Sequence, residues 1–184
     1  WVAGNHDNLD VLQDVSTKRK LLNDKCITIK QHHFILLNSV AKDEDGTNKS
    51  SGKLDKNELA FLENELLTHP LHNCIIVLHH PPVPSGTWKD NRMLKNADDF
   101  LGVIDNHKNV KLVLYGHQHQ ILRTVRNDVI YYSPPAASFQ FDRNIKWGFE
   151  NSFSGYGLVQ IDKNALITCD DVFVNFQINP IYAK

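Results

Sequence analysis

Three short segments of the chain carry histidine and asparagine side chains at spacings that suit metal binding. They are Gly4-Asn5-His6-Asp7, His79-His80-Pro81-Pro82 and Gly116-His117-Gln118-His119. Neutral imidazole is a preferred ligand of divalent transition metals. Each segment alone also has a plainer explanation. Glycine, asparagine and aspartate are common turn residues, and two histidines one residue apart occur in solvated loops. A shared site therefore depends on whether the fold brings the three segments together.

The elements that would position these segments have the pattern of an α/β protein. Strands are expected at Cys26–Ile29, Phe34–Val40, Cys74–Leu78 and Val110–Tyr115, followed by two hairpins, Ile121–Arg126 with Val129–Ser133 and Gly157–Ile161 with Leu166–Ile178. Helices are expected from the N-cap Asp55 to Pro70 and over Ala97–His107. Each metal-capable segment directly follows a strand-like apolar run. In open α/β sheets, sites assemble at the carboxyl ends of strands, so we expect the three segments to converge.

Composition limits the classes of protein that the chain can represent. Its 184 residues suit one domain with a hydrophobic core. The net charge of -1 gives no reason to expect a nucleic acid polymer as partner. No apolar run approaches the ~20 residues of a membrane span. The three cysteines lie far apart without C-x-x-C spacing, which favours reduced thiols in a cytoplasmic protein.

In this order and with these separations, the three segments resemble the G-N-H-D, H-H-P-P and G-H-x-H motifs of the calcineurin-like metallophosphoesterases. The chain looks most like the bacterial class III cyclic-nucleotide phosphodiesterases, the cyclic-AMP phosphodiesterase group, over nearly its whole length. Supporting matches are Gly52-Lys53-Leu54, Leu94-x-Asn96, Ser133-Pro134 and Phe139-Gln140-Phe141. The resemblance implies an α/β fold, a four-layer α/β/β/α sandwich, with two divalent metal ions at its rim. Mn or Fe is favoured by ligand type, and Zn is an alternative.

The resemblance also implies a role for each matching residue. Asn5, His79 and His117 would bind the second metal ion, and His119 the first. His6 would be the catalytic residue that contacts the substrate phosphate. Asp7 and His80 would support the ligands from behind, and Asn96 is a further candidate for substrate binding. The two ions would share a bridging hydroxide that attacks phosphorus in line with the leaving alkoxide.

Two motifs that the family carries upstream of G-N-H-D, D-x-H and a following G-D, are absent before Gly4-Asn5-His6-Asp7 in this sequence. We therefore expect residues 1–184 to be one truncated domain whose N-terminal part is absent, with Trp1–Gly4 as the tail of a buried strand. Such a fragment alone would hold its metals partially or not at all and would be nearly inactive. Its open sheet edge would invite strand swapping or pairing with a second copy.

Three functions remain open at this stage. The first is metal-dependent hydrolysis of a small 3',5'-cyclic nucleotide, with cyclic AMP as the leading substrate. The second is another phosphodiesterase or phosphatase of the same family, acting on glycerophosphodiesters or 2',3'-cyclic nucleotides. The third is a catalytically dead scaffold or binding module on the same fold. Trp88, Phe139, Phe141 and Trp147 could stack a base, although packing is the favoured explanation for each of them.

Overall fold

The computed structural model describes residues 1–19, 24–42, 49–150, 153–162 and 166–174. Its centre is a six-stranded mixed sheet with the order β1-β2-β3-β4-β6-β5. The strands are β1 (Cys26–Ile29), β2 (His32–Leu36), β3 (Asn73–Val77), β4 (Val110–Leu114), β5 (Leu122–Arg126) and β6 (Val129–Ser133). Strands β2, β3, β4 and β6 are parallel, and β1 and β5 are antiparallel edges. A separate hairpin pairs β7 (Ser154–Ile161) with β8 (Ile167–Val174).

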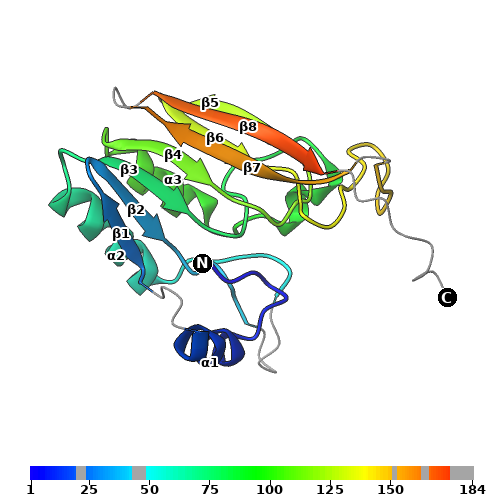
Figure 1. The fold of residues 1–184 in the computed structure, drawn as a ribbon, viewed down its shortest axis with the longest axis horizontal. Helices are drawn as coiled ribbons and strands as arrows, with labels where there is room; N and C mark the ends of the chain where they lie inside the picture. Colours follow the sequence, from blue (N-terminus) through cyan, green and yellow to red (C-terminus); the bar gives the residue numbers. More distant parts are fainter. Residues whose placement is uncertain (20–23, 43–48, 151–152, 163–165, 175–184) are drawn as a thin grey trace.

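The sheet lies between a helical layer and the β7–β8 hairpin (Figure 1). Helices α2 (Lys56–Thr68) and α3 (Ala97–Asp105) cover one face, where Leu62 and Phe100 are fully buried with Ile76. The adjacent residue Ile75 points to the other face, where it packs with Cys169 of β8. Consecutive strand residues alternate between faces, so β3 contributes to both cores. The α/β class is confirmed, and helix, sheet and hairpin form three consecutive layers of the expected sandwich.

The helix predicted after Asp55 is confirmed together with its cap. The Asp55 carboxylate accepts a hydrogen bond from the backbone N–H of Glu58 at 2.8 Å, as the capping-box spacing requires. Strands β1 and β6 have the predicted bounds, and most other predicted strands differ by one to a few residues at the ends. Residues 175–178, the end of the last predicted strand, lie outside the described residues. The second predicted strand is shifted: β2 begins at His32 and ends at Leu36, before Val40. The polar residues His32 and His33 are buried in β2, so hydrophobicity alone misplaces its start.

Three features differ from the sequence prediction. Helix α1 (Leu9–Arg19) and the 3₁₀ helix η1 (Trp88–Arg92) were not expected. Helix α1 buries only Ser16, so it lacks the apolar stripe by which an amphipathic helix is recognised. Trp1–Gly4 does not form a strand, although Ala3 and Gly4 are buried. No helix in the described ranges has the length and apolarity needed to cross a membrane.

Candidate metal centre

Two neighbouring parallel strands deliver the two histidine motifs to the same edge of the sheet. His79 lies just beyond the carboxyl end of β3, and His117 lies just beyond that of β4. The backbone N–H of Gly116 donates to the carbonyl of His79 at 3.0 Å, which fixes the two loops to each other. Asn5 comes from the N-terminal loop, where Asp7 accepts a hydrogen bond from the N–H of Gly4 at 2.7 Å. The predicted convergence of three distant segments is therefore present.

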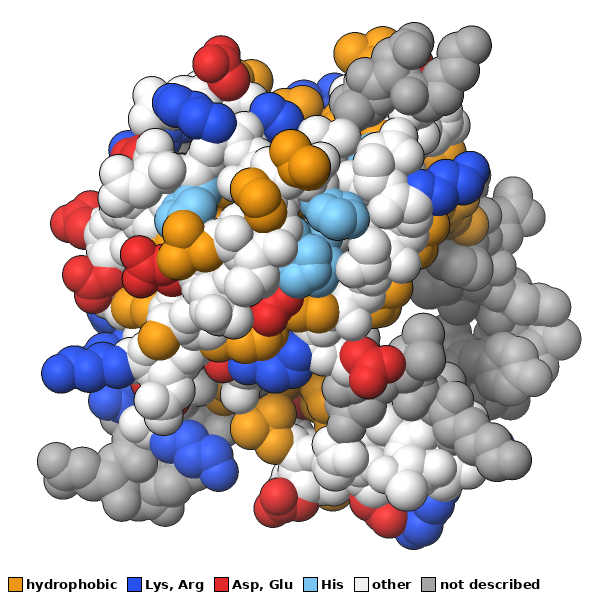
Figure 2. Space-filling model, turned by 90° about the vertical axis from the view of Figure 1, so that its left-hand side faces the viewer, with side chains coloured by type: hydrophobic (Ala, Val, Ile, Leu, Met, Phe, Trp, Pro, Cys, Tyr) orange, Lys and Arg blue, Asp and Glu red, His pale blue; other side chains and the backbone are white. Residues whose placement is uncertain are grey.

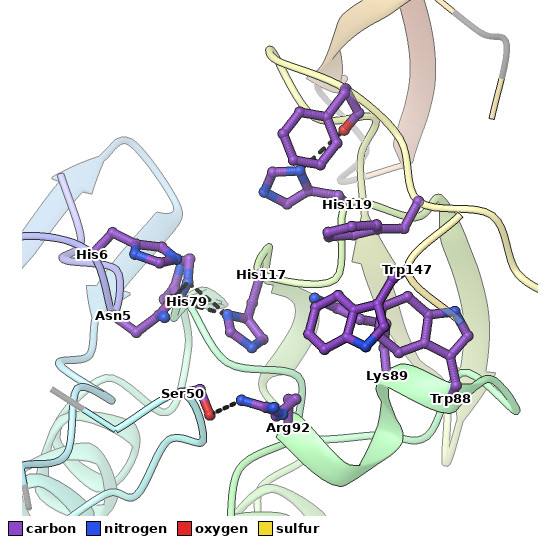
Figure 3. Close-up of a pocket in the computed structure, with 12 residues that line it drawn as sticks. Asn5, His6, Ser50, His79, Trp88, Lys89, Arg92, His117, His119 and Trp147 are labelled. Atoms are coloured by element: carbon purple, nitrogen blue, oxygen red, sulfur yellow. Dashed lines mark hydrogen bonds between the residues drawn. The ribbon is translucent and has the colours of Figure 1, made fainter. Parts of the chain in front are cut away.

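The three side chains direct one polar atom each toward a common centre (Figure 3). His79 Nε2, His117 Nδ1 and Asn5 Oδ1 form a triangle with sides of 3.1 Å. Two neutral imidazoles have two ring protons between them, so hydrogen bonds cannot satisfy all three sides with good geometry. Ligands at right angles around a cation, each at about 2.1 Å, lie roughly 3.0 Å apart. The nitrogen and oxygen donors therefore fit a divalent metal ion.

Burial keeps these imidazoles neutral. It lowers the pKa of His79 to about 4, with a smaller opposing effect from the Asp7 carboxylate. Burial, together with the neighbouring histidines His80 and His79, lowers the pKa of His117 to about 2. Only the neutral form of imidazole can donate a lone pair to a metal. The environment thus holds both side chains in the metal-binding form at neutral pH.

The backbone around the ligands tolerates few other residues. A Cβ atom on Gly4 would lie 2.9 Å from Cε1 of His79, so the absence of a side chain at residue 4 makes room for the imidazole. His117 and His119 adopt left-handed backbone conformations with φ of 68° and 50°. Such values are uncommon outside glycine and concentrate at functional sites. Both residues line the same pocket.

The residue adjacent to His79 lies behind the candidate ligands. His80 is fully buried, and its Nδ1 lies 2.8 Å from the hydroxyl of Ser39. Its ring packs against Gly52, where a Cβ atom would be 2.4 Å from His80 Nδ1. Its ring also contacts those of His79 and His117, with centroids 4.9 and 4.7 Å away. This placement suits a residue that supports the ligands.

His119 and His6 lie at the opening of the site. His119 Nδ1 donates to the carbonyl of Phe139 at 3.0 Å, which leaves Nε2 with its lone pair. A backbone carbonyl behind a histidine is the usual support of a metal ligand. His119 nevertheless lies apart from the triangle, on the side of the aromatic residues (Figure 3). His6 is solvent-exposed and lines the same pocket as Asn5.

The ligand triangle opens into a pocket of about 400 Å³. Besides the four candidate ligands and His6, it is lined by Ser50, Trp88, Lys89, Arg92, Phe139, Phe141 and Trp147. None of these described lining residues is acidic. Lys89 is only 7% exposed, and its amine lies 4.4 Å from the centre of the Phe141 ring. The pocket lining is therefore both cationic and aromatic.

Lys89 and Arg92 were missed by the sequence prediction. Both belong to the unexpected 3₁₀ helix η1, and nothing in the spacing of the motifs pointed to them. Asn96, in contrast, was predicted as a substrate-binding residue but does not line this pocket. Its amide accepts from Leu54 N–H and donates to the Leu54 carbonyl, at 3.1 and 2.9 Å. Asn96 therefore joins the start of α3 to the segment before α2.

Side chains that could hold a metal ion thus lie at the carboxyl ends of parallel strands, beside a cationic pocket, which is a typical arrangement for metal-dependent phosphoesterases. Residues 1–121 match the family model of the calcineurin-like phosphoesterases, and the chain belongs to that family. The family depends on two metal ions. The three motifs identified in the sequence lie within this match.

The curated relatives are bacterial cyclic-nucleotide phosphodiesterases. A 3',5'-cyclic-nucleotide phosphodiesterase of Nostoc is 31% identical over 88% of this chain and 59% of its own length. A "Probable cyclic nucleotide phosphodiesterase" of Vesicomyosocius okutanii is 32% identical over 89% of this chain and 66% of its own length. The 3',5'-cyclic adenosine monophosphate phosphodiesterase CpdA of Escherichia coli is 30% identical over 77% and 50%. The chain thus spans about half to two thirds of the length of these relatives.

Proposed function

We propose that residues 1–184 belong to the phosphoesterase domain of a metal-dependent phosphodiesterase that hydrolyses a 3',5'-cyclic nucleotide, with cyclic AMP as the first substrate to test. The observation that carries the proposal is the triangle of Asn5, His79 and His117, with 3.1 Å sides, facing a pocket with two cationic side chains. Relatives that are about 30% identical to this chain bear the names of cyclic-nucleotide phosphodiesterases. A scaffold that had lost catalysis would not need to keep the triangle.

In this proposal, Asn5, His79 and His117 hold one metal ion, and His119 contributes Nε2 to a second. Divalent ions supply acidification of the attacking water and neutralisation of charge on the phosphate oxygens. Mn or Fe suits a set of imidazole and amide donors, and Zn is the alternative. Asp7 supports the ligands by fixing the loop of Gly4 through a hydrogen bond. His80 supports them by packing against the rings of His79 and His117.

The unpaired cations of the pocket support an anionic substrate. None of the ion pairs found in the described part of the chain includes Lys89 or Arg92. A nearly buried ammonium without a carboxylate partner is costly, and an anion in the pocket removes that cost. Arg92 donates instead to the hydroxyl of Ser50. A phosphodiester carries one negative charge, so two side chains suffice to bind its non-bridging oxygens.

His6 completes the phosphate subsite from the opposite side. Its exposed ring lies beside Asn5 at the pocket opening, and an imidazole there can donate a hydrogen bond to a phosphate oxygen or to the leaving alkoxide. Removing such a donor typically costs about 10²–10³ in rate. His6 thus acts on the substrate directly, whereas Asp7 acts on the loop that carries it.

The aromatic side chains of the pocket lining favour a nucleotide substrate over a glycerophosphodiester, which has no base. Trp88 and Trp147 lie with their ring centres 5.0 Å apart, and Trp147 is 56% exposed. An exposed indole beside a phosphate site is suited to stack a base, which is worth about 1–3 kcal/mol in other nucleotide sites. The indole N–H of Trp88 is already held by the carbonyl of Asp142 at 2.9 Å. Trp88 is thereby fixed, and the exposed Trp147 face is the one available to a base.

The test is Mn(II)-dependent hydrolysis of cyclic AMP by the full-length protein and by its His117→Ala variant, with metal content measured for both. Turnover that disappears in the variant supports the proposal. A metal-loaded protein that leaves cyclic AMP intact contradicts the cyclic-nucleotide assignment. Parallel assays with 2',3'-cyclic AMP and a glycerophosphodiester then show whether another phosphodiester is the substrate. A folded protein that binds no metal would instead favour the scaffold function.

A further inference from the structure

A second group of metal-capable side chains lies at the opposite end of the sheet from the catalytic pocket. Cys26 begins β1, His33 is near the start of β2, and Glu65 is in the last turn of α2. The candidate catalytic ligands follow the carboxyl ends of β3 and β4, whereas this group lies where the parallel strands begin. Figure 2 shows the end of the molecule that lies at the left of Figure 1, and histidine side chains gather on it.

The ligand atoms of the group are close together. Cys26 Sγ, His33 Nε2 and a carboxylate oxygen of Glu65 all lie within 4.8 Å of one another. His33 Nε2 is 3.0 Å from Glu65 Oε2. The register of the hairpin explains the arrangement: Thr28 is paired with His33, and Cys26 lies two residues along the same face of β1. Helix α2 covers that face and supplies the carboxylate.

The surroundings orient His33 as metal ligands are usually oriented. Its Nδ1 lies 2.8 Å from the hydroxyl of Thr28, so the side chain is fixed and Nε2 is directed at Glu65. A hydrogen bond to the second ring nitrogen is the common support of a ligating histidine. The His33 side chain is 2% exposed and that of Glu65 is 17% exposed. The group is thus largely buried but can be reached from solvent through the carboxylate.

The charge of the group favours a cation. The ion-pair partners of Glu65 in the described part of the chain are His33 and His69, with no lysine or arginine. Further imidazoles border the group: His69 stacks on His33 with ring centres 3.8 Å apart, and His72 is edge-on to His69 at 5.4 Å. Cys26, His33 and Glu65 thus offer three ligand atoms, and the Glu65 carboxylate carries the negative charge.

We propose that Cys26, His33 and Glu65 form a second metal site, separate from the catalytic centre, for one zinc-like divalent ion. Thiolate, imidazole and carboxylate together are a zinc donor set, with water as the fourth ligand of a tetrahedral ion. Binding converts the Cys26 thiol to a thiolate bound to the metal and releases its proton to solvent. The ion would join the β1–β2 hairpin to the end of α2 and so stabilise this end of the sheet.

The free thiol gives binding a clear pH dependence. Burial, and then the negative charge of Glu65, raise the pKa of Cys26 to about 12, so without metal the thiol stays protonated at neutral pH. A divalent ion must displace that proton, and the affinity therefore rises with pH. Lys25, the cation that acts on the thiol, opposes this effect only weakly and is itself paired with Glu58 at 2.6 Å.

Cobalt(II) tests the site without depending on catalysis. The reduced, chelator-treated protein is titrated with Co(II), and the near-ultraviolet thiolate-to-cobalt charge-transfer absorption is recorded. The catalytic ligands include no thiol, so this band reports only a cysteine-bound ion. We expect a saturable band with the intensity of one cysteine-bound ion per chain, which persists in His117→Ala and is lost in Cys26→Ser. Glu65→Gln should weaken binding at least about tenfold, the lower end of the loss caused by removing a supporting hydrogen bond.

Cys169→Ser is the matched control, because Cys169 is a buried thiol of the β7–β8 hairpin, in the other core. Retention of the band in this variant supports the proposal. Circular dichroism checks that Cys26→Ser and Glu65→Gln remain folded. A wild-type protein with a titratable, reduced Cys26 and no band overturns the proposal, and so does a band that survives Cys26→Ser. Neither result bears on the phosphodiesterase assignment, which depends on His117.

Discussion

Replacing Lys89 with methionine tests the phosphate subsite most directly. Methionine keeps an unbranched apolar side chain against Phe141 and Trp88, and removes the ammonium group. An ammonium about 4 Å from a single negative charge is worth roughly 4 kcal/mol at an effective dielectric constant of about 20. Net values for hydrogen bonds to charged groups are smaller, about 1.5–3 kcal/mol. We expect a loss of about 2 kcal/mol, or roughly 30-fold in kcat/KM.

The assay is hydrolysis of cyclic AMP over a range of concentrations, with metal content measured in parallel. Lys95→Met is the matched control, because Lys95 is exposed and its amine contacts the carbonyl of Asn91 outside the pocket lining. Normal metal content with reduced kcat/KM assigns the loss to the substrate. A Lys89→Met enzyme within about threefold of wild type would refute the argument, since a desolvated cation on the phosphate cannot be worth so little.

The same lysine predicts an alkaline limit to activity. Burial, and then the Arg92 charge, lower the pKa of Lys89 to about 8. The ammonium is charged below that pKa and neutral above it, so phosphate binding should weaken as the pH rises through about 8. Lys89→Arg, which stays charged, should move the limit to higher pH. An unchanged profile in this variant would assign the limit to another group.

Three further predictions concern the ligands and the base. Trp147→Ala should lower kcat/KM for cyclic AMP by about 5- to 150-fold, the equivalent of about 1–3 kcal/mol of stacking, and leave hydrolysis of a phosphodiester without a base unchanged; equal losses on both would contradict stacking. Gly4→Ala should weaken metal binding in calorimetric titration, because its Cβ would lie 2.9 Å from His79, whereas Gly102→Ala meets no atom within 4 Å and is the control. Chemical denaturation of the metal-free protein should show stability falling as the pH drops from about 6.5 toward 4, because the unfolded chain protonates His79 while burial keeps it neutral in the fold; a flat profile would show that His79 is solvated.

The convergence of the three segments could be predicted because their residue types, in a fixed order along the chain, are specific for one family of proteins. His79 and His117 follow buried apolar strands, and parallel neighbours necessarily bring their carboxyl ends together. Asn5 was placed correctly beside them although the strand expected before it is absent. Its position depends on the local turn in which Asp7 binds Gly4, a contact between residues three apart in sequence.

The pocket walls were not predictable in the same way. Lys89 and Arg92 lie on a 3₁₀ helix of five residues, which is too short to show a period in the sequence. The substrate-binding role predicted for Asn96 stays untested, for a related reason. An asparagine near a site can serve the backbone or a ligand, and only the fold shows that Leu54 takes both ends of its amide. The approach of Cys26 to Glu65 could not be predicted either, because the two residues lie 39 positions apart in the sequence and show no motif spacing.

Asn5 gives metal binding a second consequence, which is thermodynamic linkage between the amino-terminal segment and the sheet. Helix α1 buries only Ser16, so few apolar contacts connect residues 9–19 with the layers behind them. An ion held jointly by Asn5, His79 and His117 joins residues 74 and 112 positions apart. At a metal concentration 100 times the dissociation constant, that coupling adds about 2.7 kcal/mol to the attached state. Hydrogen exchange of the backbone amides in the amino-terminal segment should therefore slow when metal is added. The ion would thus also stabilise the attachment of this segment to the sheet.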